Sequence, residues 1–218
     1  MKRIITASIL LIIGLSQATA QSVYRSNFND GYFNNWFIGA GAGPQLYYGD
    51  HDKQADVKDR LSLGYQFYVG NWFTPDIGAR VSFDGFKVKG LTQDQVSHST
   101  GELYNTKDRL YKQEFGYYKI QADVIFNIMN YFYSYEAKRF YSFIPYAGIG
   151  YMATTDAPKE SGVSFNLGAM NSFRISDSFN LVIDVRGNLV GDKMDGERGG
   201  RKLEGMFNST LGLTYRFR

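Results

Sequence analysis

From residue 35 onward, apolar residues alternate with polar or glycine residues, so the hydrophobic pattern has a period of two. A period of two places every second side chain on the same face of an extended strand, and the helical period of 3.6 is almost absent from this part of the chain. The alternation predicts eight β-strands, at 35–48, 60–72, 77–86, 114–127, 140–152, 162–173, 179–189 and 203–217. An even number of strands suits a closed antiparallel barrel with both chain ends on the same side.

The strand lengths and the aromatic residues decide between a soluble sandwich and a membrane barrel. A sandwich also alternates, because one face of each sheet packs into its core. The predicted strands, however, reach the roughly 9 to 11 residues that a membrane-spanning strand needs. Aromatic residues gather at the strand ends, as at membrane interfaces, at 36–37, 47–48, 72–73, 131–133 and 140–141. We therefore predict an all-β fold, an eight-stranded antiparallel up-and-down transmembrane β-barrel.

The first twenty residues have the features of a secretory signal peptide. Lys2 and Arg3 precede an apolar run at 4–14, and small residues end the segment at Ala20. The apolar run is too short to cross a bilayer as a stable helix. We expect 1–20 to be a signal peptide, 21–34 a periplasmic lead-in and 35–218 the barrel. The protein is then expected in the cell outer membrane of a Gram-negative bacterium.

Composition narrows the chemistry that the mature chain can perform. The sequence has no cysteine, so it offers neither disulfides nor thiolate ligands for a metal. Removing Lys2 and Arg3 from the 24 basic residues leaves 22, against 21 acidic residues, so the mature chain is almost neutral. No basic stripe is interleaved with aromatic residues. We expect no nucleic-acid partner and no cofactor.

The last predicted strand ends in a pattern that concerns assembly. The stretch TLGLTYRF, at 210–217, resembles the C-terminal signal by which the outer-membrane assembly machinery recognises barrel substrates. Thr210, Gly212, Tyr215 and Phe217 match that signal, and Arg218 extends one residue past its usual terminal aromatic. The resemblance implies that the barrel assembly machinery is a partner of this strand.

Three longer stretches resemble one family of barrels. They are NNWFIGAGAGPQLYYGDHDKQ at 34–54, GNWFTPDIGARVSFDG at 70–85 and KRFYSFIPYAGIGY at 138–151. They are similar to the barrel domain of OmpA-type outer-membrane proteins from Bacteroides-like bacteria, and the resemblance covers most of the mature chain. Such relatives commonly continue into a periplasmic peptidoglycan-binding domain. This sequence stops at Arg218, so we expect a barrel without that domain, and the anchoring function of such relatives is not transferred to it.

Several strands carry charges on the face opposite the apolar one. In a barrel this face points into the lumen, which side chains can fill when there are only eight strands. A charge there needs an opposite partner or water. The predicted lumen charge network consists of Arg80, Asp84, Lys119, Asp123, Asp184, Arg186 and Glu204.

The spacing of four of these charges predicts how the third and fourth strands pair. If partner numbers sum to 203, Arg80 faces Asp123 and Asp84 faces Lys119. One antiparallel register then satisfies two opposite-charge pairs at once.

A second register concerns the seventh and eighth strands. If partner numbers sum to 390, Arg186 faces Glu204, and Asp184 is left to another basic group. Together these pairs would form an internal plug. The alternative is that the same charges line a gated water path.

The connections follow from the strands. With both chain ends periplasmic, outer loops are expected at 49–59, 87–113, 153–161 and 190–202, of which the second is the largest and most polar. Periplasmic connections are expected at 73–76, 128–138 and 174–178. The connection at 128–138 is longer than is usual for such barrels.

Two features raise the question of catalysis or metal binding. His51 lies between two acidic residues and His98 among hydroxyl residues, so a base beside a nucleophile is conceivable. Neither matches the pattern of a barrel enzyme, and we expect both to be solvated loop histidines. The acidic residues of 191–200 offer oxygen ligands, but they lack the spacing of a calcium loop and lie among basic residues. We expect a polar loop there, which could meet lipopolysaccharide phosphates.

The sequence thus favours a monomeric structural barrel that contributes to envelope integrity, displays loops outside and contacts outer-membrane lipid and lipopolysaccharide. A small-solute pore, a loop-mediated adhesin and a rim enzyme are the alternatives, in that order. A pore requires the inward charges to line a water-filled path through the barrel, and an adhesin requires a ligand for the loops. We expect no enzyme, no metal site and no cofactor.

Overall fold

The computed structural model describes residues 35–49, 51–93, 98–191, 194 and 203–217. The predicted signal peptide at 1–20 and the lead-in at 21–34 lie outside the described residues, as does most of the acidic stretch at 191–200. No helix within the described ranges is both long and apolar enough to span a membrane.

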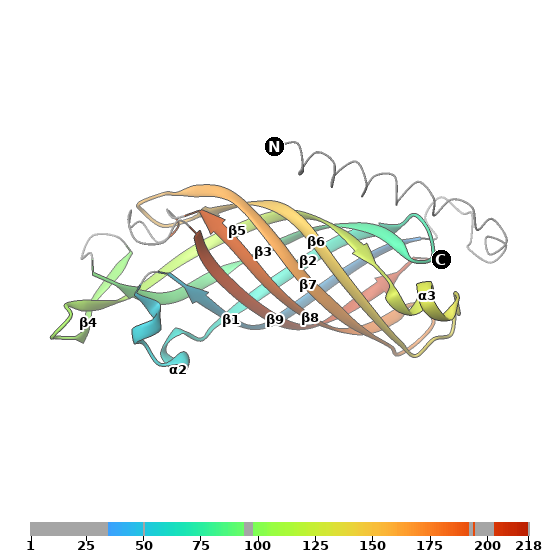
Figure 1. Cartoon of the computed structure of the whole chain (residues 1–218), viewed down its shortest axis with the longest axis horizontal. Coiled ribbons are helices and arrows are strands. Elements are labelled where there is room, and N and C mark those ends of the chain that lie inside the picture. Colours follow the sequence, from blue (N-terminus) through green and yellow to red (C-terminus); the bar gives the residue numbers. More distant parts are fainter. Residues whose placement is uncertain (1–34, 50, 94–97, 192–193, 195–202, 218) are drawn as a thin grey trace, which may run out of the picture. The chain divides into compact units, whose positions relative to one another are not determined.

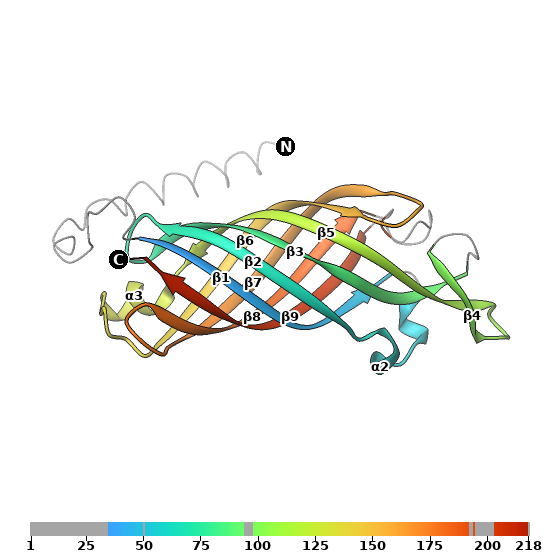
Figure 2. The same ribbon diagram turned by 180° about the vertical axis from the view of Figure 1, so that it is seen from behind.

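Eight antiparallel strands close into a barrel (Figure 1 and Figure 2). They are β1 (Trp36–Tyr48), β2 (Ser62–Trp72), β3 (Ile77–Thr92), β5 (Leu110–Phe126), β6 (Tyr141–Thr154), β7 (Ser161–Arg174), β8 (Phe179–Gly191) and β9 (Leu203–Arg216). Each strand pairs with the next, β3 pairs with β5, and β9 pairs with β1 to close the ring. The predicted fold class is confirmed.

The stretch at 87–113 is not the loop that we expected. Strands β3 and β5 continue as a paired ribbon out to Thr92 and Tyr111, and a further strand, β4 (Ser99–Asn105), pairs with β5. The period of two is interrupted at Phe86, whose φ of 129° accompanies an exposed side chain where the alternation requires a buried one. The alternation resumes at Val88, which is fully buried. A pattern that ends at Phe86 therefore underestimates the strand.

The barrel has a polar inside and an apolar outside. Buried residues include glutamine, serine, asparagine, arginine, lysine and aspartate, while leucine, isoleucine, valine and phenylalanine side chains of the same strands are exposed. The aromatic pairs at the strand ends divide between the two faces, because Trp36 and Tyr48 are exposed whereas Phe37 and Tyr47 are buried. An apolar exterior of this kind fits a barrel that is surrounded by lipid.

The two ends of the barrel are built differently. At the end that we call the loop end lie a short 3-10 helix, η3 (Asp52–Gln54), the helix α2 (Val57–Arg60) and β4 (Figure 1). The opposite end, which we call the turn end, holds the connections 73–76 and 175–178 and the helix α3 (Ile128–Tyr133). The helix α3 accounts for the unusual length of the connection at 128–138, and Asn127 caps it by accepting a hydrogen bond from the Asn130 amide.

Candidate functional site

Six charged side chains from three strands, β3, β5 and β8, meet in the middle of the lumen. We call Arg80, Asp84, Lys119, Asp123, Asp184 and Arg186 the central ion cluster, and none of them is more than 5% exposed. Three positive and three negative side chains leave the cluster neutral. The predicted register between β3 and β5 is confirmed, since Arg80 pairs with Asp123 and Asp84 with Lys119.

Arg80 joins the two sides of the barrel. Its Nε and Nη2 atoms donate to Asp123 Oδ2 at 3.0 and 2.8 Å, and its Nη1 atom donates to Asp184 Oδ2 at 2.9 Å. The guanidinium also lies over the ring of Tyr146, 4.3 Å from its centroid. Because β3 and β8 are not neighbours in the sheet, the bond to Asp184 crosses the lumen.

Arg186 forms a second bridge across the lumen. It donates to Asp84 Oδ2 at 2.9 Å, to the Tyr146 hydroxyl at 2.8 Å and to Asp184 Oδ2 at 3.3 Å. The Tyr146 hydroxyl in turn donates to the second carboxylate oxygen of Asp184. The basic partners of Asp184 are therefore Arg80 and Arg186. The sequence had not identified these partners.

Amide side chains complete the cluster. Lys119 Nζ donates to Asn188 Oδ1 at 2.6 Å and lies 3.7 Å from Asp84 Oδ2. Asn166 Nδ2 donates to Asp123 Oδ1 at 2.6 Å. Every charge of the cluster thus has at least one oppositely charged or hydrogen-bonded partner, as burial of charge requires.

The second predicted register is wrong. Strands β8 and β9 pair with Arg186 opposite Asn208, and Glu204 faces Val190 instead. The sum is therefore 394 rather than 390, a shift of four residues on β9. Glu204 is buried and accepts a hydrogen bond from the Tyr47 hydroxyl. The shift is accommodated because Arg186 has nearer acidic partners across the lumen, so its direct strand neighbour does not have to be an acid.

Tyr146, at the centre of the cluster, was not among the predicted lumen residues. Its position has the same parity as Gly148 and Gly150, on the inward face of β6. A large aromatic residue among inward glycines was the available signal. Gly148 lies directly opposite Asp123, and a Cβ atom there would stand 2.3 Å from Asp123 Oδ1. The glycines therefore leave room for the cluster.

Apolar side chains fill the lumen between the ion cluster and the loop end. Along the inward face of β5, Asp123 and Lys119 are followed by Tyr117 and Phe115, and the last two belong to a buried cluster. We call this cluster the apolar plug, and its members are Tyr47, Val88, Phe115, Tyr117, Met152, Val190, Met194 and Met206. On the side of the plug that faces the ion cluster, the Tyr117 hydroxyl donates to Gln45 Oε1 at 2.6 Å.

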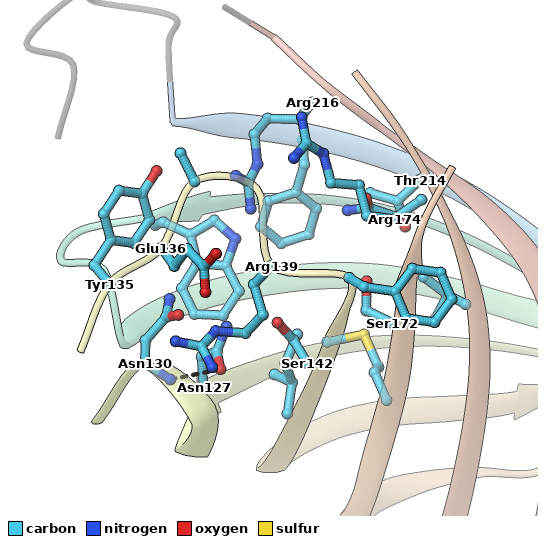
Figure 3. Close-up of a pocket in the computed structure, with 18 of the residues that line it drawn as sticks. Asn127, Asn130, Tyr135, Glu136, Arg139, Ser142, Ser172, Arg174, Thr214 and Arg216 are labelled. Atoms are coloured by element: carbon cyan, nitrogen blue, oxygen red, sulfur yellow. Dashed lines mark hydrogen bonds between the residues drawn. The ribbon is translucent and has the colours of Figure 1, made fainter. Parts of the chain in front are cut away.

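Cavities adjoin the lumen beside the ion cluster and at the turn end. One lies beside the ion cluster, is lined by residues that include Gln66 and Asn208, and measures about 10 Å³, room for no more than about one water molecule. The other, which we call the mouth cavity, opens at the turn end and measures about 70 Å³ (Figure 3). Arg139, Arg174 and Arg216 are among its lining residues.

The predicted assembly residues lie on the strand that closes the barrel. Gly212 pairs with Gly41 and Tyr215 with Ile38, so β9 depends on β1 for its second neighbour. The Phe217 amide donates to the Trp36 carbonyl at 3.0 Å. The recognition of Thr210, Gly212, Tyr215 and Phe217 by an assembly machinery remains a prediction.

The expectation of a solvated histidine is wrong for His98. Its side chain is only 7% exposed and packs against Phe115, with ring centroids 4.8 Å apart. Burial lowers the pKa of His98, because it disfavours the charged imidazolium. His98 therefore extends the apolar plug at the loop end, whereas His51 lies directly before η3 and is half-buried. Among the described residues, no group of three or more His, Asp or Glu side chains could hold a metal ion.

Comparison with curated proteins finds distant relatives. The chain is 27% identical to Outer membrane protein 40 of Porphyromonas gingivalis over 196 residues, which is 84% of this chain and 47% of the relative. It is 24% identical to Outer membrane protein 41 of the same bacterium over 158 residues, 70% of this chain and 37% of the relative. The chain spans half or less of the length of these curated relatives. No protein-family profile matches it.

Solved structures with the same fold are also barrels of the outer membrane. Neisserial surface protein A superposes with a TM-score of 0.55 at 11% identity, covering 84% of this chain and 97% of that one. The N-terminal β-barrel domain of Pseudomonas aeruginosa OprF superposes with a TM-score of 0.50 at 13% identity, covering 84% and 98%. At such identities the likeness shows the fold. Together with the curated relatives, it establishes that the chain is a bacterial outer-membrane protein with a closed, eight-stranded antiparallel barrel.

Proposed function

We propose that this chain is a monomeric structural barrel of OmpA type, which contributes to envelope integrity, displays the loop end outside the cell and does not conduct. The observation that carries this proposal is the filled lumen. A solute would have to pass the neutral ion cluster and then the apolar plug, which follow each other along the barrel. The cavity beside the ion cluster measures about 10 Å³.

The two obstacles differ in their chemistry. Breaking a buried, hydrogen-bonded ion pair leaves a charge without its partner, at a cost of about 3–5 kcal/mol. The apolar plug offers a permeating ion no replacement for its water shell. Both would have to rearrange together for conduction, so a filled lumen supports a structural role better than a pore.

The test is single-channel conductance of the refolded mature protein in planar bilayers. An unboiled gel-mobility shift confirms that the protein is folded, and a general porin in the same bilayers shows that insertion is detected. We expect a folded and silent barrel. Reproducible current steps that change in Asp184→Asn would contradict the proposal, because they would place the ion cluster along a water path.

The environment of the barrel follows from the same proposal. The apolar exterior contacts outer-membrane lipid and lipopolysaccharide, and the turn end, with its short connections, faces the periplasm. We infer that the barrel assembly machinery recognises β9. If so, Phe217→Ala should slow assembly in cells while leaving the refolded protein equally stable in detergent. Equal assembly rates for Phe217→Ala and the unmodified chain would argue against recognition through this residue.

The second candidate function is adhesion, and the sheet that extends beyond the barrel at the loop end favours it. Strands β3, β5 and β4 form a three-stranded extension there (Figure 2). Such a surface is available to a partner outside the cell without any change in the barrel. We propose no enzymatic activity, because His98 is packed into the plug and is not arranged as an accessible base.

A further inference from the structure

We propose that the mouth cavity binds the free carboxylate of a peptide that ends in a small apolar residue. The cavity combines a basic rim with an apolar floor. Its rim carries Arg139, Arg174 and Arg216, and its floor is formed by Phe37, Trp72, Ile144, Met170 and Val182. Figure 3 shows Arg139 projecting among the labelled polar side chains, with Asn127 and Asn130 on one side and Ser142 on the other.

Arg139 is held in place by the helix next to it. Its Nη2 atom donates to the Ser134 carbonyl at 2.7 Å and to the Tyr133 carbonyl at 3.3 Å, which are the last carbonyls of α3 and of its cap. These bonds fix the guanidinium without using its other nitrogens. The side chain is therefore positioned before any ligand arrives.

The Nε atom of Arg139 is buried and has no hydrogen-bond partner among the described residues. A buried donor of this kind needs an acceptor, and a carboxylate oxygen is the acceptor that a guanidinium binds most strongly. The neighbouring charges favour an anion. Three arginines face two acids, Glu136 and Asp177, and Arg174 already contacts Asp177.

The size and floor of the cavity limit what accompanies the carboxylate. A space of about 70 Å³, room for several water molecules, is sufficient for a carboxylate with a methyl-sized substituent. Ser142 and Ser172, which are paired on β6 and β7, place hydroxyls on its wall. The C-terminal alanine of a peptide meets both requirements. In the periplasm, two kinds of molecule present such a terminal carboxylate. They are cell-wall stem peptides that end in D-alanine and protein C-termini built of L-residues.

The experiment is binding of short peptides to the refolded mature protein in detergent micelles, measured by calorimetry. The probes are acetyl-D-Ala-D-Ala, acetyl-L-Ala-L-Ala and the C-terminal amide of each. We expect one or both acids to bind at least tenfold more tightly than the amides. The D-form alone would identify the cell-wall source, and the L-form alone a protein source. Equal affinity of acids and amides, or no binding at all, would overturn the proposal.

Two variants separate the cavity from general folding. Arg139→Gln should weaken binding of the acid at least tenfold, whereas Arg109→Gln, which removes an exposed arginine at the loop end, should not change it. If Arg139→Gln fails to fold, Ser172→Leu fills the cavity while leaving Arg139 and α3 intact. Unchanged binding in a folded Arg139→Gln or Ser172→Leu variant would overturn the proposal. Because this assay needs no bilayer current, its outcome is independent of whether the barrel conducts.

Discussion

At the scale of residues, the central ion cluster is held by shared partners rather than by separate pairs. Asp184 accepts from Arg80, Arg186 and Tyr146, and Arg186 reaches acids on two different strands. A buried pair of this kind contributes little net stability relative to apolar side chains, but breaking it is costly because the remaining charge stays buried. The cluster therefore selects one register and one closed barrel.

Exchanging the charges of Arg80 and Asp123 tests whether the ion pair between them stabilises the observed register of β3 with β5. Arg80→Asp and Asp123→Arg should each lower the free energy of unfolding by about 3–5 kcal/mol, because each leaves two like charges buried together. The double variant should recover part of the loss, limited by the bond between Arg80 and Asp184. Urea unfolding of the refolded barrel in lipid vesicles measures all three. A double variant no more stable than the worse single one would contradict direct coupling.

Lys87 and Glu114 provide the matched control on the same two strands. Their side chains form an ion pair at 2.9 Å, but both are partly or largely exposed. Exposed pairs are screened by water and contribute little. Reversing Lys87 and Glu114 singly or together should therefore leave the unfolding free energy nearly unchanged.

Asp52 gives the loop end a dependence on pH. It accepts hydrogen bonds from the Gly49 amide at 2.7 Å and the Leu91 amide at 2.6 Å, which tie η3 to the end of β3. Burial raises the pKa of Asp52 to about 6, above its ordinary value of 3.8, and the two amide bonds oppose this rise. A raised pKa means that the docked loop favours the protonated acid.

Docking of this loop should weaken as the pH rises from about 4 to about 6. The stabilisation is complete below the ordinary pKa and is lost through the raised one, a change on the order of 3 kcal/mol. Hydrogen exchange of the Gly49 and Leu91 amides, corrected for intrinsic rates, measures it. Asp52→Asn should remove the dependence. Protection that increases over this pH range would show that the sign is wrong.

At the scale of elements, inward glycines on one strand make room for large inward side chains on the next. Gly168 of β7 lies directly opposite Arg186 of β8. A Cβ atom at Gly168 would stand 2.4 Å from the Tyr146 hydroxyl and 2.6 Å from the Val185 carbonyl oxygen. Strands β6, β7 and β8 thus fit together only if this position has no side chain.

Gly168→Ala should therefore destabilise the barrel by about 1–3 kcal/mol, the usual cost of an added methyl group in a packed interior. Gly162→Ala on the same strand is the control, since nothing lies within 4 Å of a Cβ atom there. Urea unfolding of the two variants measures the difference. Equal stabilities would mean that Tyr146 moves aside freely, and the cluster would then be looser than the structure indicates.

At the scale of the whole barrel, four layers follow one another from the turn end to the loop end. They are the mouth cavity, the central ion cluster, the apolar plug and the three-stranded extension. Of these four layers, only the extension projects beyond the barrel (Figure 1). It should therefore be removable without loss of the membrane-embedded part.

Replacing 93–110 by Asn-Gly tests this separation. Thr92 and Tyr111 are paired, so a two-residue turn can join them as a hairpin. The shortened chain should keep its gel-mobility shift, because the ion cluster and every member of the apolar plug remain. Its unfolding free energy should fall only by the contribution of the buried His98 and Leu110. If the extension is an adhesive surface, binding to host cells or matrix should be lost at the same time. A shortened chain that no longer folds would show that the extension supports the barrel.

The eight strands, their inward and outward faces and one register were predictable from the amino-acid sequence alone. The reason is that the period of two is a local property, and lipid outside with polar groups inside makes that period easy to recognise. The pairing of Arg80 with Asp123 was also accessible, since β3 and β5 are joined by a single connection and their charges match in only a few registers.

The partners that meet across the lumen could not be predicted from the sequence. Arg186 binds Asp84 and Tyr146 from strands that are not its neighbours, so no register of β8 with β9 could reveal those bonds. The apolar plug could not be predicted from the sequence for the same reason. Its members come from six strands and one loop, and within each segment they look like ordinary alternation. Closure of the barrel brings distant inward residues within contact, and contacts across an interior depend on the geometry of the whole ring.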